Sequence, residues 1–223
     1  ADRELFIAIG TGNQIEEPHP TTYNKQFVAF VTDVDSNPVV NQKLTISAVP
    51  DGFHKGQWVR IYKDPAQDEF IQWATVGLPL SANPALYSDW DPTHFCINED
   101  TNIDGILDPG EDTNGSGTLT PGNVLSSLAA ISTDGLETAR VEAITDSEGK
   151  VILDLVYPQS FGSWVNINLI VSGAVKGTET FAKATFTLPT LASDLLDENI
   201  SPPTANTGGR GPFGLLPDCT TVE

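Results

Sequence analysis

The sequence predicts an all-β protein, folded as a β-sandwich that carries a long inserted loop region. Apolar and polar residues alternate at period two along several short segments, as in strands with one buried face. The chain also contains 16 prolines and 19 glycines, which is typical of closely spaced turns between strands. A central acidic segment differs in charge from both of its flanks, and we therefore interpret it as an insertion.

Six segments are rich in Val, Ile, Leu and Phe and are bounded by turn residues, which favours strands. The alternation is clearest in the second half of the chain, where Asn166 and Asn168 oppose an apolar row. Turns are predicted at residues 35–38 and 146–149, where Asp, Ser, Asn, Pro and Gly cluster. The predicted strands are residues 4–10, 27–33, 43–49, 151–157, 165–171 and 182–188.

These strands divide the chain into three parts. Residues 1–50 and 136–190 together supply about the 100 residues that an immunoglobulin-like β-sandwich needs. Residues 51–135 form the insert: between Lys63 and Arg140 there is no Lys or Arg, but there are 13 Asp and Glu. Residues 191–223 form a C-terminal tail rich in Pro and Gly, which we expect to lie extended over the sandwich, pinned by Cys219; a free linker is the alternative.

The most specific motif is a twelve-residue pattern that occurs twice without a gap, at residues 100–111 and 112–123. Both copies begin Asp-Thr-Asn and have Gly at position 6; the first ends in Glu111. Oxygen-bearing side chains at positions 1, 3, 5 and 9, Gly at 6 and Glu at 12 are the pattern of a loop that wraps calcium. The alternative is a plain acidic turn, since loops in general use Asp, Asn, Gly and Pro.

The second copy is poorer in charge, because Ser116, Thr120 and Asn123 replace carboxylates. We expect it to bind a second ion loosely, to borrow Asp108 or Glu111 from the first copy, or to be only a structural turn. The predicted ligands of the first ion are Asp100, Asn102, Asp104, the carbonyl of Ile106, Asp108 and Glu111, and those of the second are Asp112, Asn114, Ser116 and the carbonyl of Thr118.

The spacing of the two copies argues against a calcium switch. A sensor pair of EF-hands needs helices that flank each loop and change their angle when the ion binds. Here Asp112 follows Glu111 directly, and Pro109 and Pro121 disfavour a regular helix. We therefore expect a fixed clip that holds a long loop in shape.

Charge and cysteine content restrict the class of protein. The net charge of −19 excludes non-specific binding to nucleic acid or to an anionic membrane as the main function. Cys96 and Cys219 are the only cysteines. In an extracellular calcium-binding protein they are expected to form one disulfide, which favours a secreted or cell-surface location; free buried thiols are the alternative. No apolar run approaches the ~20 residues of a membrane span.

The insert begins with aromatic residues that invite two interpretations. Residues 57–63 and 70–76 are predicted to form a hairpin around Asp64 and Pro65. Exposed rings beside carboxylates could bind sugars, but we favour a small core for the insert. No nucleophile–base constellation or phosphate loop with a known spacing occurs, so we predict no enzymatic activity. The rings in question are Trp58, Tyr62, Phe70, Trp73, Tyr87 and Trp90.

Several segments outside the insert resemble a known family. Residues 30–39, Phe-Val-Thr-Asp-Val-Asp-Ser-Asn-Pro-Val, are similar to the strand and turn of bacterial immunoglobulin-like domains of invasin-type and intimin-type adhesins. Residues 144–157 resemble the second characteristic turn and strand of that family, and residues 164–171 and 180–188 its closing strands. The resemblance implies a non-catalytic spacer or presentation module on a bacterial surface.

Together these observations predict a structural or adhesive module that is exported and stabilised by calcium. Its partners would be neighbouring protein domains, copies of itself or surface glycans. One alternative is a subunit of an extracellular filament, in which an edge strand such as residues 4–10 pairs with the next copy. The other is a carbohydrate-binding module that uses Trp58, Trp73 or Trp90 as a platform.

Overall fold

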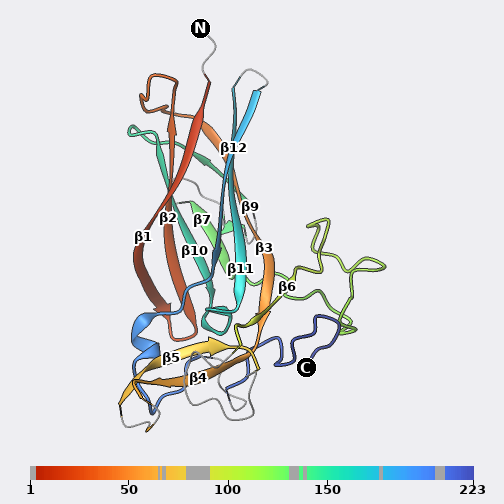
Figure 1. Cartoon of the computed structure of the whole chain (residues 1–223). Helices are drawn as coiled ribbons and strands as arrows, with labels where there is room; N and C mark the ends of the chain where they lie inside the picture. Colours follow the sequence, from red (N-terminus) through yellow and green to blue (C-terminus); the bar gives the residue numbers. More distant parts are fainter. Residues whose placement is uncertain are drawn as a thin grey trace. The chain divides into compact units, whose positions relative to one another are not determined.

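The computed structural model describes residues 4–64, 66, 69–78, 91–130, 136–137, 140–175, 178–203 and 209–223 (Figure 1). It contains antiparallel sheets and short 3-10 turns, and no α-helix occurs in these ranges. The prediction of an all-β sandwich is therefore confirmed. In the same ranges, no helix has the length and apolar character to cross a membrane.

Two five-stranded sheets contain most of the strands. The first has the order β1 (Phe6–His19), β2 (Thr22–Thr32), β10 (Lys150–Pro158), β7 (Ser127–Ala130) and β8 (Leu136–Glu137). The second has the order β12 (Thr178–Thr187), β11 (Val165–Val175), β3 (Lys43–Lys55) and β6 (His94–Ile97), with β9 (Arg140–Ile144) also paired to β3. A separate hairpin joins β4 (Gln57–Tyr62) to β5 (Phe70–Val76).

The chain divides into two compact units. The first comprises residues 1–49, 125–158 and 167–186, and the second comprises residues 50–124, 159–166 and 187–223. Strand β7 was expected within the insert, but it pairs with β10 and belongs to the first unit. The tail was expected as a separate part, but residues 187–223 belong to the second unit together with the insert.

The core of the first unit lies between the two sheets, as the period-two pattern predicts. The ring centroids of Phe27 on β2 and Phe186 on β12 lie 4.7 Å apart and connect the sheets. The β12 row from Ala182 to Phe186 is only half-buried, because β12 is the last strand of its sheet. Fully buried side chains from the predicted rows are Leu153, Leu155, Tyr157, Ile167, Leu169 and Val171.

The aromatic residues of the insert form a small core in the second unit. Trp58 and Trp73 are 5% and 6% exposed, so neither offers an open platform for a sugar. Trp58 packs edge-on against Trp164 with the ring centroids 5.7 Å apart, and the Nε1 of Trp73 donates to the carbonyl of Asp197 at 2.8 Å. The hairpin prediction is confirmed by the pairing of β4 with β5. Tyr87 and Trp90 lie outside the described residues.

The C-terminal segment is held against β3 and β4 by backbone and side-chain bonds. Gly56 donates to the carbonyl of Gly214 and accepts from the N–H of Gly211. Lys55 is fully buried, and its Nζ donates to the carbonyls of Asp218 and Thr221 at 2.7 and 2.8 Å. The C-terminal segment joins the compact unit because its carbonyls satisfy a buried cation and because the Phe213 ring packs against Phe53 and Phe161, with centroids 4.7 and 5.9 Å away.

Candidate metal centre

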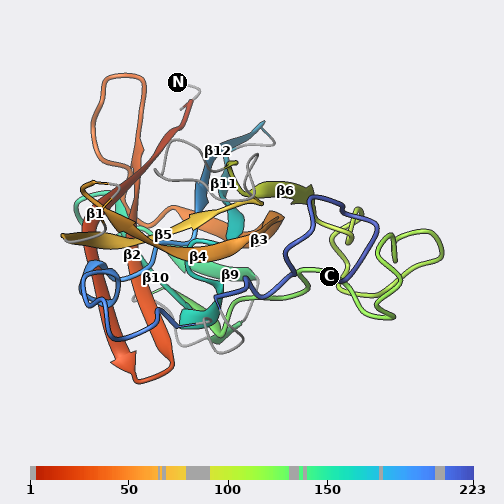
Figure 2. The same ribbon diagram turned by 60° about the horizontal axis from the view of Figure 1, so that its bottom comes forward.

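The predicted disulfide between Cys96 and Cys219 is present, with the Cα atoms 5.6 Å apart. It links β6 to the C-terminal segment, which lies next to the segment that carries the acidic loops (Figure 2). Among the described residues, only His94, Cys96 and Cys219 bring three His, Cys, Asp or Glu ligand atoms within 4.8 Å of one another. Since both sulfurs are in the disulfide, this group has no thiolate to offer a metal.

The first acidic loop adopts a compact turn in which side-chain oxygens accept backbone N–H groups. The Asp100 carboxylate accepts from the backbone N–H groups of Asp104, at 3.1 Å, and Gly105, at 2.9 Å. The carboxylate of Asp104 accepts from the N–H of Ile106 at 2.8 Å. Gly105 has φ of +76° with open space around it, so the backbone conformation, and not crowding, requires glycine at position 6.

Positions 3, 5 and 9 of this loop meet at the Asn102 side chain. Its Nδ2 donates to Asp104 and to Asp108, each at 3.0 Å. Because one N–H donor group serves both carboxylates, positive charge placed between them would be favoured. To bind a calcium ion there, the Asn102 amide would turn its oxygen inward. The carboxylates would also move closer, because no three of them in the described residues bring an oxygen each within 4.8 Å of one another. Every predicted side-chain ligand carries an oxygen atom that calcium can bind, so the set fits calcium.

Glu111 closes the first loop from position 12. Its Oε1 accepts from the N–H and the hydroxyl of Thr101 at 2.9 and 2.8 Å, and its Oε2 accepts from the N–H of Asp108 at 3.0 Å. The N–H of Asp108, followed by the hydroxyl and N–H of Thr101, lowers the pKa of the Glu111 carboxyl. Glu111 is therefore an anion that ties position 2 to position 9.

The second loop repeats the turn of the first. The Asp112 carboxylate accepts from the N–H groups of Ser116 and Gly117, at 2.9 and 3.1 Å. The Ser116 hydroxyl donates to the carbonyl of Thr118 at 2.7 Å, so the oxygens of positions 5 and 7 are in contact. Asn114 is 9% exposed, and its Nδ2 donates to the hydroxyl of Thr120 at 2.8 Å.

Glu99, a residue outside both predicted ligand sets, closes the second loop. Its Oε1 accepts from the N–H and the hydroxyl of Thr113 at 3.1 and 2.7 Å and from the N–H of Asn114 at 3.0 Å. Its Oε2 accepts from the N–H of Thr120 at 2.9 Å. Glu99 thus bonds positions 2 and 9 of the second loop as Glu111 bonds those of the first.

The backbone follows the same correspondence. The N–H of Glu111 donates to the carbonyl of Asp108, and the N–H of Glu99 donates to the carbonyl of Thr120. A carboxylate from outside the second loop thus accepts hydrogen bonds from it, and this carboxylate belongs to Glu99; that the loop shares Asp108 or Glu111 as ligands of an ion stays a prediction. The sequence held a signal for this, since Glu-Asp-Thr-Asn occurs at both 99–102 and 111–114.

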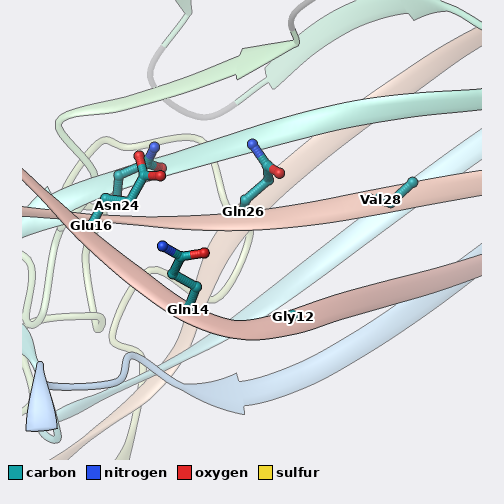
Figure 3. A pocket seen from close by; sticks show the side chains of 6 residues that line it. All are labelled: Gly12, Gln14, Glu16, Asn24, Gln26 and Val28. Carbon is teal, nitrogen blue, oxygen red and sulfur yellow. The ribbon is translucent and has the colours of Figure 1, made fainter.

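A second polar feature lies on the first unit and offers less chemistry. Figure 3 shows a shallow pocket between β1 and β2, lined by Gly12, Gln14, Glu16, Asn24, Gln26 and Val28. The amides of Asn24 and Gln26 both donate to the Asp154 carboxylate, at 3.3 and 3.1 Å. Each of these amides therefore uses one donor within the sheet, while the Oδ1 of Asn24 is buried without a hydrogen-bond partner among the described residues.

Comparison with known proteins gives no match: no family model fits the sequence, and no curated protein is similar to it.

Proposed function

We propose that this protein is a non-enzymatic structural or adhesive module, exported to the cell surface or secreted, in which calcium stabilises the paired loops. The observation that carries the proposal is the equivalent closure of the two loops by Glu111 and Glu99. Both glutamates are buried, at 7% and 4% exposure, and both bond the same two positions of their loops. Two loops of one geometry, each rich in oxygen ligands, suit calcium better than a plain acidic turn does.

The first loop is the stronger of the two proposed sites. Asp100, Asn102, Asp104, Asp108 and Glu111 with the Ile106 carbonyl would hold the first ion. The second site would use Asp112, Asn114 and Ser116 with the Thr118 carbonyl, and Glu99 supplies the carboxylate that position 123 lacks. Calcium bound there would offset the repulsion among these acids and hold the segment between β6 and β7 in one shape. That role suits a spacer in a surface protein.

The likeness of residues 30–39 and 144–157 to bacterial immunoglobulin-like adhesin domains is part of this proposal. Two features support it: the all-β architecture and the disulfide, which suits an oxidising compartment. The two turns on which that likeness rests are closed by aspartate side chains. The Asp33 carboxylate accepts from the backbone N–H groups of Asp35 and Asn37 at 3.0 and 2.9 Å. The Asp146 carboxylate accepts from the backbone N–H of Glu148 at 2.9 Å.

Thermal unfolding in calcium, in magnesium and in a chelator, with native mass spectrometry, tests the proposal. A ligand at 100 times its Kd adds about 2.7 kcal/mol, which for a chain of this size raises Tm by roughly 5–10 °C. We expect this shift with calcium and one or two bound ions. Asp104→Asn should reduce the rise in Tm with calcium. Glu142→Gln should preserve it, because Glu142 is exposed and lies outside the loops. No bound ion and no shift in the unchanged protein would refute the calcium site.

A further inference from the structure

Strand β12 ends its sheet, and among the strands of the described residues none lies beside one of its two edges. Natural proteins usually protect such edges with bulges, prolines or inward charges, because an open edge can pair with another chain. Strand β1, at the end of the other sheet, has this protection: its register shifts between Thr11 and Ile15 and again between Glu16 and His19, and it contains Pro18. In β12, burial alternates without interruption from Glu179 to Thr187, and there is no proline.

The outer face of β12 carries an unusual side chain for an open edge. Phe181 is 69% exposed, and it lies between Glu179 and Lys183, both also exposed. These three residues point to the same face, because they alternate along the strand. Neither Glu179 nor Lys183 takes part in an ion pair within the described part of the chain.

The order Glu-Phe-Lys is self-complementary in an antiparallel pair. When two β12 strands pair around a two-fold axis at Phe181, Phe181 faces Phe181 of the second copy. Glu179 of each chain then lies opposite Lys183 of the other, so two opposite-charge pairs flank one aromatic pair. On the opposite face, Thr180 meets Ala182, and these small residues leave room for close approach of the strands.

We propose that this chain forms a two-fold symmetric dimer by antiparallel pairing of β12 with β12 of a second copy. The pairing buries Phe181, gives both open edges backbone partners and joins two sheets into one continuous sheet. Because the interface uses the same patch on both chains, it closes at two copies and does not propagate. The inference is independent of the metal centre, which belongs to the other compact unit.

The test is sedimentation equilibrium of the full chain over a range of concentrations at low salt, in calcium and in chelator. We expect a concentration-dependent dimer in both solutions. Phe181→Thr should raise the dimer Kd about tenfold, since it removes an aromatic pair. Glu179→Lys or Lys183→Glu should each raise it on the order of tenfold, because two attractive pairs become repulsive.

Mixing the two single charge variants is the decisive arm. A Glu179→Lys chain and a Lys183→Glu chain restore both opposite-charge pairs in a heterodimer, so the mixture should dimerise with a Kd about tenfold lower than that of either variant alone. The double variant should also recover the dimer. Glu142→Lys and Lys43→Glu are matched controls, because they reverse an exposed ion pair on other strands. Circular dichroism and Tm verify that every variant is folded.

A monomer at all concentrations in the unchanged protein would overturn the inference. So would a dimer that neither charge reversal weakens, or a polymer that grows with concentration. A dimer without calcium binding would refute only the metal site, and calcium binding by a strict monomer would refute only the dimer.

Discussion

Replacing Glu99 tests whether this residue closes the second loop. Its carboxylate accepts three backbone N–H groups and one hydroxyl at 2.7–3.1 Å, and it is 4% exposed. Glu99→Gln keeps the shape but turns one acceptor oxygen into a donor. Whichever way the amide turns, it leaves at least one N–H, of Thr120 or of Thr113 and Asn114, without an acceptor.

A buried donor that loses its acceptor costs about 1–3 kcal/mol; Asn114 is buried, whereas Thr120 is half-buried and Thr113 is exposed, so that water replaces part of the bonding to these two. We therefore expect Glu99→Gln to lower the free energy of unfolding by about 2 kcal/mol, and Glu99→Ala, which orphans all of the donors, by about 4 kcal/mol. Urea unfolding in chelator measures this cost without any contribution from an ion. Glu142→Gln is the matched control, because its side chain is 62% exposed and such changes usually stay within about 0.5 kcal/mol.

The same variants separate the structural role of Glu99 from its role toward a metal. In calcium titrations, Glu99→Gln should weaken the second site and spare the first, and Glu111→Gln should do the reverse. Equal urea midpoints for Glu99→Gln and Glu142→Gln would refute the reasoning, because a buried carboxylate that accepts four hydrogen bonds cannot be replaced without cost.

Three further predictions concern pH, the disulfide and the buried lysine. Because the pKa of Glu111 is lower in the folded chain than its usual 4.5, its contribution to stability is complete above about pH 4.5 and is lost as pH falls through the folded value; Tm measured against pH should show this loss, and Glu111→Gln should flatten it. Cys96→Ser with Cys219→Ser removes a link across 123 residues and should cost about 5 kcal/mol in urea unfolding; an unchanged midpoint would contradict this. Lys55→Met should cost about 3 kcal/mol by the same assay, since it removes two charge-assisted bonds to the C-terminal segment, and faster proteolysis after residue 209 should accompany it.

The strands of the sandwich core could be predicted from the sequence because their period-two rows are buried on one face. Leu153, Leu155 and Ile167 all lie in the core as expected. Strand ends were less predictable: β1 extends to His19 and β3 to Lys55, because pairing with neighbouring strands carries polar residues into the sheet.

The composition of the tail hid its place in the fold. Residues 209–223 place Phe213, Leu215, Leu216 and Val222 among Gly, Pro and Thr without a regular period, and Gly211 lies so close to the Trp164 ring that a Cβ atom would come within 2.8 Å of it. Contacts of this kind depend on backbone shape and on a distant buried lysine, neither of which leaves a local pattern. The hydrogen bonds of the loops, by contrast, follow a local spacing, and the role of Glu99 in closing the second loop was not predicted, because Glu99 precedes the first copy of the motif.

The equivalent roles of Glu99 and Glu111 bear on how such a segment could arise and change. Counted from each glutamate, the repeat is residues 99–110 and 111–122, and each repeat then supplies the carboxylate that the other one lacks. Removing residues 100–111 would leave the second loop, residues 112–123, complete in sequence. Glu99 would then be joined directly to Asp112, and its chain could no longer approach Thr113 and Thr120 by the present path. We therefore expect the second loop to lose its closing carboxylate when the segment that carries Glu99 is displaced, whereas the first loop keeps Glu111 within its own twelve residues.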